Sequence, residues 1–186
     1  FFPAKMSDRI MQVMSYLWPN HLPTWMDEYH RKYQHHLILE MSGKGIGEAC
    51  TYLQSFFKDH EGNYFECSPA DGKKAILHRF VAGGAINRYH AMKRDTAGEM
   101  MTVDVALRRN EEKWFEQLPA EIDSLIEAKF YYGHLFCHVM HQNYVLKKGV
   151  NADKLKAKIL ASFDSRGAEY PAEHNVGHEY FAKSSL

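Results

Sequence analysis

The amino-acid sequence predicts an α+β fold in which helices pack on a mostly antiparallel sheet, preceded by an amphipathic helical segment. Segments with apolar residues at helical spacing alternate with short segments rich in β-branched and aromatic residues. With 186 residues, 45% of them hydrophobic and 25% charged, the chain has an ordinary globular composition. It is also long enough to bury a core, so we expect one α+β domain with a satellite segment.

Residues 1–36 form the predicted satellite segment. Its first apolar residues fall at helical spacing: Ile10, Met11, Met14, Leu17 and Trp18. A break bounded by prolines follows at 19–23, and the next stretch, 25–36, places aromatic and Met side chains beside basic ones. Such a composition can mark a segment lying on a membrane surface. The residues alone favour the other interpretation, a helix packed on its own domain with a solvated charged face. The sequence leaves both interpretations open.

The main domain is predicted to span residues 37–186. Its expected elements, in order, are a strand over 37–41, a helix over 47–60, a strand over 64–67, a helix from Ser68 to about Phe80, a strand over 100–107, a helix from Asn110 through Leu118, strand material over 129–145 and a helix from Asn151 to Gly167. The strands are β-branched or aromatic. Ser68 and Asn151 are residue types that cap helices, Pro69 suits a first helical position, and Gly167 suits a helix end.

Composition and short patterns exclude several classes of function. The glycines at 43, 45 and 47 have neither dinucleotide-fingerprint nor phosphate-loop spacing, so we interpret them as a strand-to-helix turn. The 23 Lys and Arg balance the 23 Asp and Glu, which argues against nucleic acid as a partner. Three cysteines without CxxC spacing argue against a disulfide framework. No run approaches the roughly 18–20 apolar residues of a spanning helix.

Histidines and a carboxylate near the C-terminal end are the candidate chemical groups. His134, His141 and Glu173 are ligand types that a zinc- or manganese-like ion accepts, and His174 is a residue type that removes protons near neutral pH. In one continuous strand, His134 and His141 would point to opposite faces, because their separation of seven is odd. They converge only if a turn or bulge separates two strands. Otherwise they are hydrogen-bonded core or surface histidines.

Seven short motifs carry a resemblance to a known family. In order they are His-His-Leu (35–37), His-Arg-Phe (78–80), Val-Ala-Leu-Arg-Arg-Asn (105–110), Tyr-Tyr-Gly-His (131–134), Met-His-Gln (140–142), Val-Leu-Lys-Lys-Gly-Val (145–150) and Tyr-Pro-Ala-Glu-His-Asn-Val-Gly-His (170–178). Together they resemble the C-terminal part of the quinone-dependent, FAD-linked D-lactate dehydrogenases of bacteria. Those are peripheral respiratory enzymes of the inner membrane.

The resemblance implies roles for individual residues. His134, His141 and Glu173 match the metal ligands of the wider FAD-linked 2-hydroxyacid dehydrogenase group, and His174 matches its base. Arg79 falls near the position of that group's substrate-carboxylate arginine. Arg108 and Arg109 are its rivals for the role. Between the two histidines this chain departs from the pattern, because residues 135–140 replace a Gly-Asp-Gly-Asn turn.

The resemblance also implies a ferredoxin-like cap domain, and partners for the whole enzyme. D-lactate is oxidised to pyruvate through FAD, and electrons pass to quinone at the cytoplasmic face of the inner membrane. The FAD-binding domain of that family precedes the region matched here, and the sequence starts at Phe1 without an initiator Met. We therefore expect a fragment that has no dehydrogenase activity alone. The alternative interpretation is a non-catalytic module for membrane docking or subunit contact.

Overall fold

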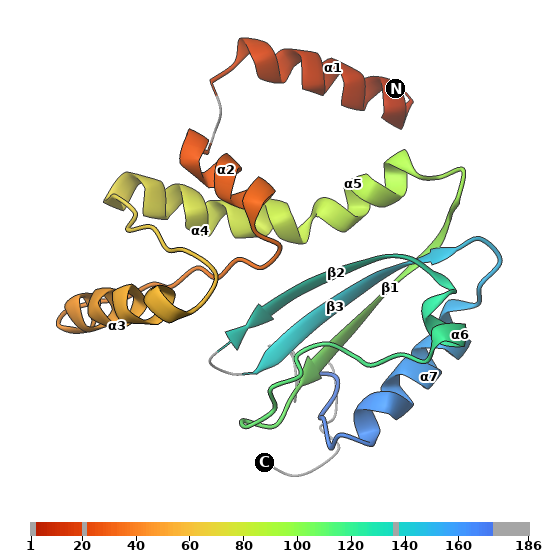
Figure 1. Ribbon diagram of the computed structural model, residues 1–186. Helices are drawn as coiled ribbons and strands as arrows, with labels where there is room; N and C mark the ends of the chain where they lie inside the picture. Colours follow the sequence, from red (N-terminus) through yellow and green to blue (C-terminus); the bar gives the residue numbers. More distant parts are fainter. Residues whose placement is uncertain (1–2, 20–21, 136–137, 173–186) are drawn as a thin grey trace. The chain divides into compact units, whose positions relative to one another are not determined.

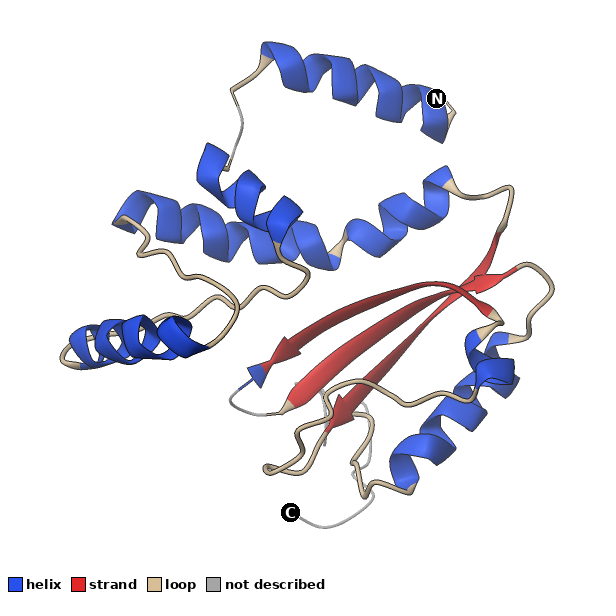
Figure 2. Ribbon diagram, viewed as in Figure 1, coloured by secondary structure: helices blue, strands red, loops and turns tan. Residues whose placement is uncertain are grey.

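The computed structural model describes residues 3–19, 22–135 and 138–172. The chain divides into two compact units, Phe1–Ala82 and Gly83–Leu186. Figures 1 and 2 show helices throughout the first unit and a three-stranded sheet in the second. The predicted α+β class with an antiparallel sheet is confirmed. The boundary between units lies beyond residue 36, and the separate membrane role of residues 1–36 stays a prediction.

Four helices make up the regular structure described in the first unit. They are α1 (Ala4–Leu17), α2 (Thr24–Lys32), α3 (Gly45–Asp59) and α4 (Pro69–Gly83), the last ending at the unit boundary. The predicted helices over 47–60 and from Ser68 are confirmed. Ser68 caps α4 as expected: its hydroxyl accepts from the backbone N–H of Asp71 at 3.2 Å and donates to the Asp71 carboxylate at 2.9 Å.

The two strands predicted in this unit, over 37–41 and 64–67, are wrong. Both segments are irregular, and no other described segment pairs with either of them. A run of apolar residues cannot form a strand without a neighbouring ladder. Residues 64–67 are instead held against α2 by side chains. Trp25 stacks on Phe65 at 3.6 Å between ring centroids, and the Tyr29 hydroxyl donates to the Tyr64 carbonyl at 3.3 Å.

The second unit contains the sheet. Its elements are α5 (Ala85–Met92), β1 (Ala97–Ala106), α6 (Ala120–Asp123), β2 (Ile126–His134), β3 (Val139–Lys147) and α7 (Ala152–Asp164). The strand order is β1-β3-β2 and both pairs are antiparallel. The predicted strand over 100–107 and the strand material over 129–145 are confirmed, the latter as two strands joined by a turn.

Helix α7 covers one face of this sheet (Figure 1). Asn151 caps it by accepting the Lys154 N–H at 2.8 Å, and the buried side chains of Leu155, Ile159 and Phe163 pack on the sheet, both as predicted. The sheet contributes apolar side chains to the same core, among them Val103, Val105, Met140, Tyr144 and Leu146. Burying a large apolar side chain stabilises the fold by about 1.5–3 kcal/mol. This core is therefore the main support of the sheet.

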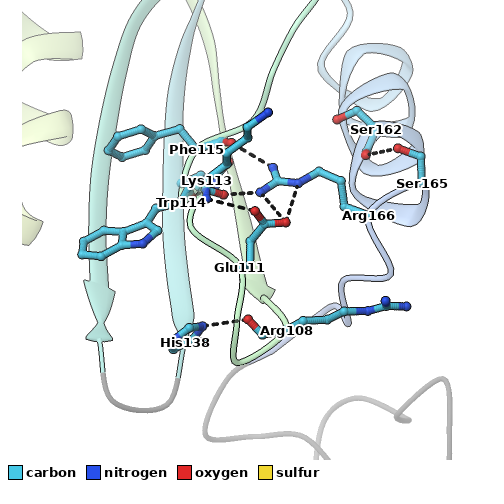
Figure 3. A network of polar contacts seen from close by, with 10 residues as sticks. Arg108, Glu111, Lys113, Trp114, Phe115, His138, Ser162, Ser165 and Arg166 are labelled. Atoms are coloured by element: carbon cyan, nitrogen blue, oxygen red, sulfur yellow. Dashed lines mark hydrogen bonds and ion pairs between the residues drawn. The ribbon is translucent and has the colours of Figure 1, made fainter.

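The predicted helix from Asn110 through Leu118 is wrong. Residues 107–119 form an irregular segment, here called the covering loop (Figure 3). Arg166, just beyond α7, donates to the carbonyl of Phe115 at 2.8 Å and to that of Lys113, and pairs with Glu111. Carbonyls bound in this way are lost to an i to i+4 ladder. The Lys113 N–H, together with Arg166, holds the pKa of the Glu111 carboxyl below its ordinary value.

Candidate active site

The sheet face opposite α7 is apolar at one end and polar at the other. Helix α5 covers the apolar end, where Ile86 and Tyr89 pack with Val145 and Phe130. The polar end carries side chains from all three strands: Thr102, Asp104, Tyr132, His134, His141 and Asn143. They share a face because antiparallel register places Asp104 and Tyr132 on either side of His141, and Thr102 beside Asn143.

His134 and His141 meet on this polar face. The turn between β2 and β3 sets Val139 opposite His134 and Tyr132 opposite His141, so the odd separation of seven still leads to one face. The two ring centroids lie 5.3 Å apart with the rings nearly perpendicular. The sequence predicted that His134 and His141 would converge only if a turn or bulge separated two strands, and the structure meets this condition. His138, between them in sequence, donates from Nδ1 to the Arg108 carbonyl at 2.9 Å instead.

Asp104 is a member of this group that the sequence analysis missed. Its Oδ1 lies 2.9 Å from His141 Nδ1, and the two side chains are 25% and 19% exposed. A signal was present in the sequence, because Asp104 is the one charged residue within the apolar alternation of residues 101–107. A carboxylate in a half-buried strand position usually has a partner, and the neighbouring strand supplies an imidazole.

The segment after α7 reaches the outer edge of β1 beside Asp104. Ala106 and Glu169 exchange backbone hydrogen bonds of 2.8 and 3.0 Å, and the Ala172 N–H donates to the Asp104 carbonyl at 3.0 Å. Ala172 is the last residue described. Glu173 and His174, the predicted ligand and base, follow it directly in the sequence and lie outside the described residues.

The two predicted substrate arginines lie in different units. Arg79 is exposed on α4, with its guanidinium 4.7 Å from the centroid of the Phe80 ring. Arg108 follows β1, and its guanidinium lies against Gly167, whose positive φ of 63° ends the turn after α7 (Figure 3 shows the Arg108 side chain). No group of three His, Cys, Asp or Glu side chains in the described ranges could hold a metal. The described site supplies two imidazoles of the predicted set, a donor type that suits zinc or manganese.

On the α7 side of the sheet, a second polar group lies under the covering loop. Glu116 has a fully buried side chain, pairs with Lys129 at 3.1 Å and accepts from the Tyr131 hydroxyl at 2.6 Å. Burial, reinforced by Glu116, raises the pKa of Tyr131 and of Tyr144. Burial alone would lower the pKa of Lys129, but hydrogen bonds to Asp123 and Glu116 raise it instead. This group joins the loop to the sheet, so we interpret it as structural.

Three imidazoles meet in the first unit. The ring of His30 lies 4.6 Å from that of His36 and 5.1 Å from that of His78. Burial, together with the two neighbouring rings, lowers the pKa of His30, and Asp27 opposes this shift. Because the pKa is lower in the folded chain, His30 contributes stability above its unfolded value of about 6.5, and this contribution is lost as the pH falls through the folded value.

Replacing His78 by Gln is therefore expected to raise the pKa of His30, because one source of positive charge is removed. An NMR titration of the histidine ring protons measures the midpoint directly. His60→Gln is the matched control, since His60 stacks on Phe56 in α3 and belongs to another contact. An unchanged His30 midpoint in His78→Gln would show that the neighbouring ring does not act on it.

Comparison with known proteins decides the family. The family model described as "D-lactate dehydrogenase, membrane binding" matches residues 1–186. The chain belongs to this family. The resemblance noted in the sequence is thereby confirmed. Helices of this member of the membrane-binding D-lactate dehydrogenase family expose apolar side chains. No helix in its described part is long and apolar enough to cross a bilayer.

Curated relatives agree with membership of the membrane-binding D-lactate dehydrogenase family. The chain is 50% identical over 186 residues to the "Quinone-dependent D-lactate dehydrogenase" of Escherichia coli (strain K12), covering 100% of the chain and 33% of that protein. It is 50% identical over 187 residues to the protein of the same name from Haemophilus influenzae, with the same coverage. The Corynebacterium glutamicum protein of that name is 43% identical over 182 residues, 97% of the chain and 32% of the relative. The chain thus spans about a third of the length of these relatives.

Proposed function

We propose that this chain is the membrane-binding and cap region of a peripheral respiratory enzyme that oxidises D-lactate to pyruvate and passes the electrons to quinone. The observation that carries the proposal is the meeting of His134 and His141 on one sheet face in a chain that matches the family throughout. Attachment to the cytoplasmic face of the inner membrane is part of the same proposal. The names of the curated relatives support D-lactate as substrate and quinone as acceptor.

The chemistry assigned to this chain is substrate placement and proton removal. FAD supplies the redox chemistry when it is bound elsewhere in the enzyme. His174 would accept the hydroxyl proton of D-lactate, and the C2 hydrogen would pass to the flavin as hydride, which gives pyruvate. His134, His141 and Glu173 would hold a divalent metal where one is bound, and that metal would polarise the hydroxyl and carboxylate oxygens of the substrate. Arg79 or Arg108 supplies the cation for the substrate carboxylate.

The described segment that precedes Glu173 supports the inclusion of Glu173 in the proposed site. The Ala172 N–H binds the carbonyl of Asp104, whose side chain binds His141. Glu173, the predicted acidic ligand, follows Ala172 directly in the sequence. This supports one site assembled from β1, β2, β3 and the segment after α7.

Membrane attachment is assigned to α1. This helix buries none of its residues. Its apolar stripe consists of Met6, Ile10, Val13, Met14 and Leu17, all of them exposed. Exposed apolar stripes of this size beside cations such as Lys5 and Arg9 favour an interfacial helix over the alternative of a helix packed on its own domain.

An Ile10→Glu substitution in the intact enzyme tests this assignment. The apolar contribution of one Ile to interfacial binding is about 1.5–3 kcal/mol. We therefore expect binding to phosphatidylglycerol vesicles to fall by about tenfold or more. Cosedimentation measures the bound fraction, while turnover of D-lactate with a soluble electron acceptor is expected to stay unchanged.

Gln12→Glu is the control for the vesicle experiment, because it adds the same charge to α1 away from the apolar stripe. Its vesicle binding is expected to change much less than that of Ile10→Glu. Equal losses in the two variants would indicate that charge alone matters. Undiminished binding of Ile10→Glu would remove α1 from the membrane contact.

A further inference from the structure

Asp104 and His141 form a pair that the proposed function does not yet use. We propose that Asp104 is a positioning residue, which holds His141 with its proton on Nδ1 and so presents Nε2 to the metal or substrate oxygen at the site. This inference rests on the proposed role of His141. It adds a residue from β1, which lies on the other side of His141 from His134.

The hydrogen bond itself specifies the tautomer of His141. The Asp104 Oδ1 to His141 Nδ1 distance of 2.9 Å is that of a good hydrogen bond. An ionised carboxylate only accepts, so the proton between the two atoms belongs to the imidazole. In neutral His141 the lone pair is then on Nε2, which is the nitrogen that a metal or a hydroxyl donor requires.

The backbone holds Asp104 in place from both sides. On one side β1 pairs with β3, and Asp104 is directly opposite His141 in that register. On the other side its carbonyl accepts the Ala172 N–H at 3.0 Å. Both side chains are partly buried, at 25% and 19% exposure, so solvent weakens the contact less than at an open surface.

A carboxylate behind a histidine is a recognised way to orient a metal ligand. The partner fixes the ring and raises the basicity of the other nitrogen, and its loss usually costs 10–100-fold in metal affinity. Thr102 and Asn143 provide an internal comparison one step along the same strands. Their side chains also bind across β1 and β3, at 2.7 Å, but neither touches His141 in a described contact.

The test uses the intact dehydrogenase, treated with chelator and then titrated with Zn²⁺ against a chromophoric competitor. Asp104→Ala is expected to weaken Zn²⁺ binding by roughly 10–100-fold. Asp104→Asn retains an oxygen that accepts from Nδ1–H, so a smaller loss is expected. Thr102→Val, the matched control, is expected to leave Zn²⁺ affinity within about twofold, and FAD content and vesicle binding report on folding in every variant.

A second measurement is independent of metal. In protein labelled with ¹⁵N-histidine, with the His141 signal assigned through His141→Gln, the wild type is expected to show the Nδ1–H tautomer and Asp104→Ala a shift toward Nε2–H. A wild-type Nε2–H tautomer, or unchanged tautomer and Zn²⁺ affinity in Asp104→Ala, would overturn the proposal. So would an equal affinity loss in Thr102→Val. If the wild type binds no Zn²⁺, the metal part of the proposed function fails, and the tautomer still decides the role of Asp104.

Discussion

Replacing Lys129 by Met is expected to destabilise the chain by about 3 kcal/mol, because it leaves the fully buried Glu116 carboxylate without its cation. The Lys129 side chain is 29% exposed and can be replaced by an apolar side chain at small packing cost, whereas Glu116 cannot reach water. The Tyr131 hydroxyl would still donate to Glu116 Oε1, but Glu116 Oε2 has no hydrogen-bond partner among the described residues, so the carboxylate would be only partly compensated. The midpoint of urea unfolding measures the change.

Replacing Glu116 by Gln is expected to destabilise the chain less than replacing Lys129 by Met. Comparing the two variants tests whether the unpaired buried carboxylate is the cause. In Glu116→Gln the remaining cation, Lys129, still pairs with Asp123, which is half exposed. We therefore expect Lys129→Met with Glu116→Gln to be more stable than Lys129→Met alone. Lys147→Met is the matched control, since Lys147 is an exposed residue of the neighbouring strand, and its expected change is within about 0.5 kcal/mol. If Lys129→Met is as mild as this control, the buried pair does not support the covering loop.

Replacing His174 by Ala in the intact enzyme is expected to lower D-lactate turnover by about 10²–10⁴-fold, since a positioned base contributes roughly that factor. Vesicle binding is expected to stay the same, because the base and the apolar stripe of α1 are separate features. Turnover with a soluble electron acceptor and vesicle cosedimentation are the two measurements. A loss of vesicle binding with turnover intact would favour the non-catalytic docking module.

His178 provides the control for the base. It is the same residue type, four positions further along the same segment. His178→Ala is expected to retain most of the turnover, and any general damage to this segment would appear in both variants. Equal losses would mean that His174 has no special role.

Elements that depend on local sequence were predicted well. Asn151 caps α7, and the helical spacing of the apolar residues places them on one face. A short stretch of sequence contains both signals. The strands over 37–41 and 64–67 were wrong because strand formation depends on a partner elsewhere in the chain. The helix from Asn110 was wrong because Arg166, more than 50 residues away, binds the carbonyls that the helix would use. No local pattern carries that information.

The candidate site was predictable in its residue types and not in its geometry. The sequence identified His134 and His141, but which face each occupies depends on where the turn between two strands falls. Asp104 and Glu116 were missed because the importance of a carboxylate depends on its cross-strand or cross-loop partner. An acid within an apolar strand was the available signal for Asp104.

The hydrogen bond from Ala172 to the edge of β1 makes α7 a spacer of set length. After β3 the chain runs along the sheet as α7, which is 13 residues long, and the segment that follows the helix pairs with the edge of β1 at Ala106 and Asp104. Each residue inserted into the helix would rotate the segment that follows it by about 100° and advance it by about 1.5 Å. A residue inserted into or deleted from α7 is therefore expected to displace the last described segment from the edge of β1.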